Sequence, residues 1–244
     1  MDSLEIRTDR FAAVKPVFES PDATFHESPF EQVNDFARAH LWFFDLDTNE
    51  RPVLDASSLS CEEHERASRL KTSQLQRRFI ASRVFVRAVL GNVLGMNAGE
   101  ISFATTPAGK PFLDQHRAIA RQPGERLCFN FSHSENVLLL GIAFGREIGV
   151  DVEVVKPELD VLALAQTQFS ERECVQLREL SGRDRVRKFY QLWTRFEAIA
   201  KATGEGIAAL RQAHENLAVH QFDFDADGRS VACAVALQSR TAKC

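Results

Sequence analysis

Three acidic residues stand at positions where they could hold a metal ion. Asp151 and Glu153 lie two apart in the stretch GVDVEV, and Glu197 lies in the stretch WTRFEA. Alternating β-branched valines predict a strand, in which residues two apart point to one side with their carboxylates roughly 7 Å apart. Such oxygens suit Mg²⁺, which takes one or two protein carboxylates and completes its shell with water and substrate phosphate oxygens. The pattern therefore indicates a metal site that acts on a phosphate-bearing substrate.

A predicted helix over residues 185–203 carries the third carboxylate. Glu197 falls just off the edge of an apolar stripe, and Lys201 follows about 40° further round the helix. This pair could bind metal and phosphate at the rim of the core, although an ordinary surface ion pair would have the same spacing. The stripe itself consists of Phe189, Leu192, Trp193, Phe196 and Ala200.

The stretch FNFSHS puts polar side chains at the end of a predicted strand. A serine hydrolase is excluded because Ser132 and His133 are adjacent and point apart, and because no G-x-S-x-G motif is present. We interpret His133 and the hydroxyls as phosphate ligands. A structural hydrogen bond is the alternative for His133, and a helix cap or turn is the alternative for Ser134.

Two further motifs have sufficient structural explanations. Ser170 is followed three residues later by Glu173, which is the spacing of a capping box. A catalytic role for Glu173 therefore needs other support. The stretch GKP at residues 109–111 is typical of a turn, although Lys110 on a rigid loop could reach an anion.

The elements that must position these residues alternate along the chain. A long helix is predicted from Ser58 or Ser60 to residue 94, with a break near Thr72 and a stop at Gly95. Residues 137–144 could form a strand or follow a cap at Ser134. Further helices are expected at 159–168 and 171–180, and strands at 40–46, 101–104, 127–131, 148–155, 221–225 and 230–236.

The composition is that of a globular protein. Of the 244 residues, 44% are hydrophobic and 26% charged, with a net charge of −4, so no overall field attracts nucleic acid. The five cysteines are scattered without a zinc-type spacing. The first residues lack the apolar run of a signal peptide, and no apolar stretch is long enough to span a membrane. We therefore expect a cytoplasmic protein with reduced cysteines.

The GKP, FNFSHS, GVDVE, FSERE and WTRFEA motifs occur here together and in this order. That series resembles the 4′-phosphopantetheinyl transferases of the surfactin-synthetase-activating type. The resemblance covers roughly residues 62–207. It implies an α+β fold, a pseudodimer of two similar α/β halves at residues 1–146 and 147–244, with the active site in the cleft between them.

The resemblance also implies a reaction. The 4′-phosphopantetheine arm moves from coenzyme A to a serine of an apo acyl or peptidyl carrier protein, and adenosine 3′,5′-bisphosphate is released. The implied cofactor is Mg²⁺, and the protein is expected to act as a monomer on carrier domains of polyketide, nonribosomal peptide or fatty acid synthesis. Neither a nucleic acid nor a membrane is an expected partner.

Residue roles follow from the same resemblance. Asp151, Glu153 and Glu197 would hold Mg²⁺ on the pyrophosphate, and Lys201 would contact the phosphate where charge shifts. Glu173 would help to deprotonate the acceptor serine. The residues implied in binding the nucleotide and its phosphates are Arg66, Arg78, Arg83, Lys110, Pro111, Ser132 and His133.

The chain departs from the family pattern at two places. Members usually have a lysine before the glutamate of the Trp motif, where this chain has Phe196, and some carry a basic residue near Glu63. Because position 196 lies within the apolar stripe, we expect Phe196 to pack without disturbing the fold. The competing hypotheses are a non-catalytic coenzyme A-binding interaction protein on the same scaffold and a metal-dependent pyrophosphate hydrolase.

Overall fold

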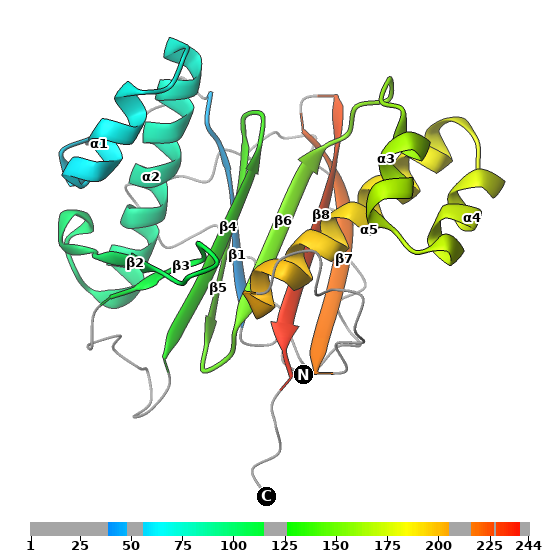
Figure 1. Ribbon diagram of the computed structural model, residues 1–244. Coiled ribbons are helices and arrows are strands. Elements are labelled where there is room, and N and C mark those ends of the chain that lie inside the picture. The colour runs from blue at the N-terminus through cyan, green and yellow to red at the C-terminus, as the bar shows by residue number, and fades with distance from the viewer. Residues whose placement is uncertain (1–38, 48–55, 115–125, 205–215, 227, 240–244) are drawn as a thin grey trace, which may run out of the picture.

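Two three-stranded antiparallel sheets form the centre of the molecule (Figure 1). The computed structural model describes residues 39–47, 56–114, 126–204, 216–226 and 228–239. A 22-residue helix lies against each sheet. The first sheet has the order β1 (Ala39–Asp45), β5 (Val137–Phe144), β4 (Leu127–Ser134), and the second β6 (Ile148–Val154), β8 (Arg229–Gln238), β7 (Leu217–Ala226).

The two halves have the same topology. In each half, the chain forms one strand of the central sheet, then a long helix and then two more strands. The third strand lies in the middle of the sheet and pairs with both of the others. The two sheets meet where β4 of the first half lies beside β6 of the second. The expected α+β class with two similar halves is therefore confirmed, and residues 137–144 form strand β5 rather than a helix.

The helices of the first half begin and end as the sequence predicts. Helix α1 (Cys61–Ser68) starts with a capping box between Ser60 and Glu63. Helix α2 (Ser73–Leu94) follows the break with Thr72 as its N-cap, and it ends at Gly95 in the left-handed conformation. The 3₁₀ turns η2 (Ala56–Ser58) and η3 (Ala98–Glu100) and the small sheet of β2 (Phe103–Thr105) and β3 (Pro111–Leu113) complete this half.

The second half carries α3 (Val161–Gln168) and α4 (Glu171–Glu179) before its long helix α5 (Gly182–Thr203). Helix α3 begins later than residue 159 because Asp160 caps it through the backbone N–H of Ala163. Strands β7 and β8 are longer than predicted, since hydrophobic residues of β8 continue the pairing beyond the short β-branched segment.

Close packing of α5 on β6 brings the helix near the sheet. A Cβ atom on Gly149 would lie 2.1 Å from the carbonyl oxygen of Ala198 and 2.3 Å from the nitrogen of Ala202, so only glycine fits this approach. Strand β8 presents small residues to the same helix, including Ala234 and Ala236. The short distance places the polar edge of α5 directly beside β6.

The described part of the chain contains no helix long and apolar enough to cross a membrane. Four cysteines lie within it, and all four are free thiols. Three of them, Cys128, Cys174 and Cys233, are buried, where a cysteine packs as a small apolar side chain.

Candidate active site

Strand β6 places Asp151 and Glu153 on the side of the sheet that faces α5. The alternating residues Val150 and Val152 are fully buried in the core on the opposite side, which fixes the orientation of the strand. Asp151 is only 2% exposed, whereas Glu153 is half-buried. The predicted acidic pair therefore lies at the boundary between the two sheets and not on a solvated edge.

Side chains from two other elements, β4 and α5, converge on Asp151. The Lys201 ammonium on α5 donates to Asp151 Oδ1 at 2.5 Å and to Ser132 Oγ on β4 at 2.9 Å. The Ser132 hydroxyl in turn donates to the same Oδ1 atom at 2.8 Å. The second oxygen, Oδ2, is buried and makes no hydrogen bond within the described structure. Asp151 thus has one saturated oxygen and one that is open to a further ligand.

Burial raises the pKa of all three candidate metal ligands. It raises the pKa of Asp151 against the opposing effects of Lys201 and Ser132. For Glu153, burial and the charges of Asp151 and Glu197 act together. For Glu197, burial and the charge of Asp151 raise the pKa, while Lys201 lowers it. A cation bound among these groups would favour their ionised forms.

The carboxylates fit a magnesium ion that is also held by its substrate. Among the residues that the structure describes, no three His, Cys, Asp or Glu side chains are close enough to form a complete metal cage. Magnesium does not need one, since it usually keeps several positions for water and phosphate oxygens. The buried open oxygen Asp151 Oδ2 is a ligand of the required type, with Glu153 and Glu197 close enough to influence its charge.

A second group of side chains in the site is cationic. The Arg83 guanidinium lies between the rings of Phe79 and Phe131, at 5.1 and 4.8 Å from their centroids. The Arg66 guanidinium also lies over the ring of Phe79, 5.6 Å from its centroid. Burial lowers the pKa of Arg83, and the Glu63 carboxylate is 3.9 Å from its Nε atom. Aromatic faces stabilise these cations without neutralising them.

His133 joins this cationic group. Burial lowers the pKa of His133, and the charges of Arg83, Lys201 and Arg66 lower it further. The residue keeps more than a third of its surface exposed, so solvent screens part of this effect. The charges of Arg66 and Arg83 in the first half and of Lys201 in the second therefore act on one imidazole, which is a suitable environment for an anion.

Two other predicted substrate-binding residues lie outside this group. Arg78 forms a two-point ion pair with Asp47, with Nε at 2.8 Å from Oδ1. It is not among the cations that act on His133. Pro111 begins β3 opposite Thr105 and shapes the GKP turn.

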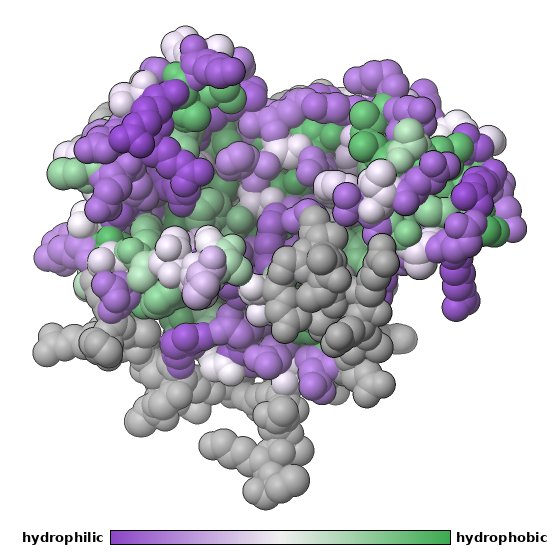
Figure 2. All heavy atoms as spheres, viewed as in Figure 1, coloured by the Kyte–Doolittle hydropathy of each residue, from purple (hydrophilic) through white to green (hydrophobic). Residues whose placement is uncertain are grey.

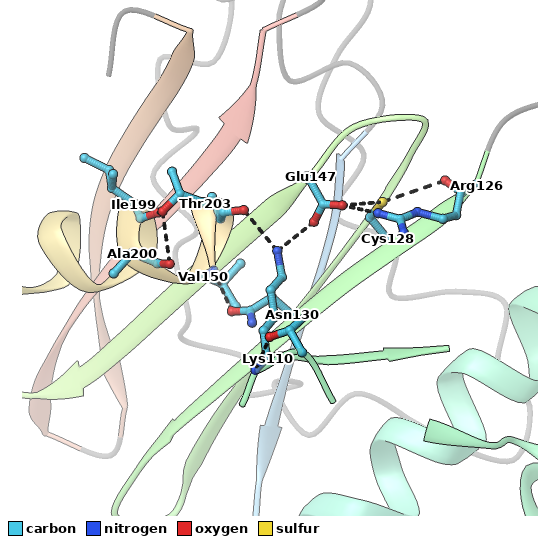
Figure 3. A network of polar contacts seen from close by, with 11 residues as sticks. Lys110, Arg126, Cys128, Asn130, Glu147, Val150, Ile199, Ala200 and Thr203 are labelled. Atoms are coloured by element: carbon cyan, nitrogen blue, oxygen red, sulfur yellow. Dashed lines mark hydrogen bonds and ion pairs between the residues drawn. The ribbon is translucent and has the colours of Figure 1, made fainter. Parts of the chain in front are cut away.

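Lys110 binds the end of α5 instead of facing the cationic group (Figure 3). Its ammonium donates to Glu147 Oε2 at 2.7 Å and to the carbonyl oxygen of Ala202 at 3.0 Å. Arg126 pairs with the same carboxylate, and the Cys128 thiol lies 3.7 Å from it. This network joins the GKP loop of the first half to the second half.

Glu173 forms the predicted capping box. Its Oε2 atom accepts hydrogen bonds from the Ser170 backbone N–H at 2.9 Å and from Ser170 Oγ at 2.7 Å. Ser170 Oγ accepts from the Glu173 N–H in return. The structure therefore establishes the capping role, and Glu173 is not among the groups that act on Asp151, Glu153 or Glu197.

The structure also shows contacts that the sequence analysis did not anticipate. Ser134, interpreted as a phosphate ligand with a cap or turn as the alternative, donates to Glu153 Oε2 at 2.7 Å. Glu63 is held by Arg87, whose Nε lies 2.8 Å from Glu63 Oε2, so this position serves a buried ion pair. The signal for Ser134 in the sequence was its two-residue spacing from Ser132, which matches the spacing of Asp151 and Glu153 on β6.

Phe196 packs as expected. Its ring stacks on Phe169 with centroids 5.4 Å apart and planes inclined by 21°. Together with Trp193 and Gln168, these rings line a small hollow next to Glu197. The departure from the family lysine is therefore accommodated by the core.

The molecule therefore combines acidic residues on β6 and α5 with a group of cations across two topologically equivalent α+β halves, as expected of an enzyme that acts on a phosphate ester. The family model described as 4′-phosphopantetheinyl transferase superfamily matches residues 147–241, and that described as 4′-phosphopantetheinyl transferase, N-terminal, matches residues 48–143. The chain belongs to the 4′-phosphopantetheinyl transferases of the two-domain, surfactin-synthetase-activating type. It is thus an enzyme of the class that transfers 4′-phosphopantetheine to carrier proteins.

Individual relatives agree with this assignment. The chain is 39% identical over 174 residues to the 4′-phosphopantetheinyl transferase HetI of Nostoc sp., covering 71% of each protein. It is 29% identical over 150 residues to the transferase psf-1 of Bacillus pumilus, covering 62% of this chain and 60% of that one. The transferase gsp of Aneurinibacillus migulanus is 29% identical over 130 residues, 53% of this chain and 49% of its own.

Proposed function

We propose that the protein moves the 4′-phosphopantetheine arm of coenzyme A to a serine hydroxyl of an apo carrier protein, at the boundary between β4 and β6. The observation that carries this proposal is the contact of Asp151 with Lys201 and Ser132, which leaves a buried carboxylate oxygen open. We propose the division at residues 1–146 and 147–244, so that the first half supplies most of the cations and the second the carboxylates.

The transfer is a displacement at phosphorus. The serine oxygen forms a bond to the phosphorus that bears the pantetheine arm, and the bond from this phosphorus to the bridging oxygen breaks. Adenosine 3′,5′-bisphosphate leaves with the electron pair, and the hydroxyl proton passes to a base. Lys201 is proposed to stabilise the charge that develops on the leaving phosphate, which is the main requirement of such a step.

The proposed metal ligands are Asp151, Glu153 and Glu197. Bound Mg²⁺ would supply neutralising charge to the pyrophosphate oxygens. Lys201 already holds Asp151 Oδ1, which leaves Oδ2 to face the ligand. Because the Lys201 side chain is 28% exposed while that of Asp151 is 3% exposed, the ammonium can adjust while the carboxylate stays fixed.

The nucleotide phosphates are assigned to the cationic group. Arg66 and Arg83 act on His133 and share the ring of Phe79. Ser132, whose hydroxyl contacts Lys201 and Asp151, is assigned to the same substrate. Lys110 and Arg78 belong to the proposal only if each leaves its present acidic partner when the nucleotide binds, and Pro111 acts by fixing the loop of Lys110. If substitution of Asp47 by asparagine strengthened the binding of coenzyme A, the proposed role of Arg78 would be supported.

Glu173 is proposed as the base that receives the serine proton, directly or through water. Both bonds that its carboxylate accepts within the capping box use Oε2, so Oε1 is the atom proposed to take the proton. Glu173→Gln separates the two roles, because glutamine keeps a capping box but cannot act as a base. A lower kcat with an unchanged melting temperature is expected. An unchanged kcat would leave Glu173 as a cap alone.

The proposed acceptors are acyl or peptidyl carrier domains of polyketide, nonribosomal peptide or fatty acid synthesis, and the proposed active form is the monomer. The test incubates the protein with coenzyme A, Mg²⁺ and several apo carriers and measures the mass of each carrier. Addition of the arm is expected on at least one. Coenzyme A binding without transfer would favour the non-catalytic binding protein, and cleavage of coenzyme A without a carrier would favour the pyrophosphate hydrolase.

A further inference from the structure

Ser134 occupies the last position of β4 in the first half, yet both partners of its hydroxyl are in the second half. The hydroxyl donates to Glu153 Oε2 at 2.7 Å and accepts from the backbone N–H of Val154 at 3.1 Å. Because the backbone N–H can only donate, the hydroxyl proton must point to the carboxylate. The orientation of this hydrogen bond is therefore determined by the fold.

The contact belongs to a series along the boundary between the halves. Asn130 Oδ1 accepts from the Val150 N–H at 3.0 Å (Figure 3), and Ser132 donates to Asp151. The β4 residues are two apart, so their side chains point the same way and follow β6 in parallel register. Strands β4 and β6 belong to separate hydrogen-bonded sheets, and side chains supply these links between them.

The turn beyond Ser134 is also attached to the second half. Glu135 has a φ of 53°, a conformation that costs a residue other than glycine on the order of 1 to 3 kcal/mol. Its carboxylate lies 3.4 Å from Lys156 Nζ and 3.1 Å from Arg229 Nη1, both in the second half. These ion pairs hold the end of β4 against β6 and so help to keep Ser134 in place.

We infer that Ser134 is a positioning residue for the metal site, one that fixes the Glu153 carboxylate across the boundary of the two halves. Glutamate has a long side chain whose rotamers cost free energy to order, and Ser134 removes that freedom at one oxygen before any ligand arrives. Ser132 plays a different part, because it also accepts from Lys201 and lies at the proposed phosphate site. The inference rests on the proposed role of Glu153 as a metal ligand.

The test uses Mn²⁺ as a magnetic probe on the full chain with coenzyme A and no carrier, so that no turnover occurs. Electron paramagnetic resonance measures the concentration of free Mn²⁺ during a titration, which gives the dissociation constant of the bound ion. Ser134→Ala should weaken Mn²⁺ binding about 10- to 100-fold, which is the usual effect of removing a partner of a metal ligand. Ser134→Thr keeps the hydroxyl and should restore most of the affinity.

Ser82→Ala is the matched control. Ser82 is buried on α2 and donates to the carbonyl oxygen of Phe79 at 2.7 Å, so this change also removes one serine hydrogen bond. It should leave the Mn²⁺ constant unchanged. Thermal unfolding of each variant shows that the fold is retained.

The outcomes distinguish the inference from the function beneath it. Wild-type affinity in Ser134→Ala, or equal weakening in Ser134→Thr, would overturn the positioning role while Glu153→Gln still loses the metal. If wild-type protein and Glu153→Gln bind Mn²⁺ equally, the metal assignment itself fails. If the wild-type protein transfers the arm and Glu153→Gln weakens Mn²⁺ binding, the proposed function stands, and the Ser134 variants then test the positioning role alone.

Discussion

Strands β1 and β6 hold the same place in the topology of their halves, but they carry different residues toward the long helix. On β1, Trp42 and Phe44 face α2, and Phe44 stacks on Phe85 with centroids 4.4 Å apart. On β6, Asp151 and Glu153 face α5. One strand completes a core and the other builds the site, although both halves share one fold.

The difference follows from where each strand lies in the whole molecule. In the strand orders β1-β5-β4 and β6-β8-β7, β1 is at the outer edge of its sheet and β6 is at the boundary with the other sheet. A carboxylate on β6 therefore meets hydroxyls from β4, which no residue of β1 can do. Although the two halves share one topology, the proposed site forms at the boundary where strand β6 of the second half lies beside strand β4 of the first.

The surface of the molecule shows the same division. In Figure 2, hydrophilic residues gather over α1 on one side and over α3 to α5 on the other, and the outline is indented between these two regions. The two long helices in Figure 1 lie on either side of β4 and β6. The residues of the proposed site come from the elements that border this boundary.

The largest predicted effect is that of Asp151→Asn. Transfer of the arm should fall about 10²- to 10³-fold, because a charge-stabilising group in a buried site is removed. The metal-free variant should melt at a higher temperature than wild type at pH 7. Burial raises the pKa of Asp151, so the folded state loses stability as pH rises from the unfolded value of 3.8 through the folded pKa, and asparagine has no such loss.

Phe44→Ala is the matched change on β1. It should lower the free energy of unfolding by roughly 3 kcal/mol or more, as for other large core truncations, while the rate per folded molecule stays constant. Denaturant unfolding and a mass-spectrometric transfer assay measure both quantities. If Phe44→Ala impaired the rate of folded protein as Asp151→Asn does, the proposed contrast between the strands would be wrong.

Gly149→Ala tests the close approach of α5 to β6. The added Cβ would collide with backbone atoms of Ala198 and Ala202, which cannot move as a side chain can. We expect a loss of about 3 kcal/mol in stability, at the upper end for overpacking, and a lower transfer rate because Lys201 shifts with the helix. Gly99→Ala, where the nearest atom is 3.7 Å away, is the control and should change neither.

Phe196→Lys restores the residue usual in the family and should have a smaller effect. Losing the stack on Phe169 should cost about 1 kcal/mol in unfolding free energy. The lysine stem would lie along the core with its ammonium at the surface, so kcat should change less than twofold. A large gain in kcat would show that the missing positive charge limits this chain.

The smallest predicted effect compares histidines of the two halves by NMR titration. Burial lowers the pKa of both His133 and His220 from 6.5, so stability is lost as pH falls below that value. Nearby cations lower the pKa of His133 further. Coenzyme A phosphates should therefore raise the pKa of His133 and leave His220 unchanged. A shift of both or of neither would remove His133 from the phosphate site.

Local patterns in the sequence were sufficient for most elements. The N-cap at Ser60, the capping box at Ser170, the stop at Gly95 and the alternation of β6 are confirmed, because each depends on residues within one turn or a few positions. The packing of Phe196 was also predictable from the helical stripe. The destination of Lys110 was not, since its partner Glu147 is 37 residues away.

The sequence by itself determined that this chain has an acidic pair on a strand, a lysine one turn after a glutamate on a helix, and a motif series shared with one enzyme family. Only the tertiary structure decided that Asp151 meets Lys201 and Ser132, 50 and 19 residues away, and that Ser134 holds Glu153. Side-chain spacing along one element follows from its own helical or pleated geometry. Contacts between elements depend on how the two halves pack, and that packing is a property of the whole chain.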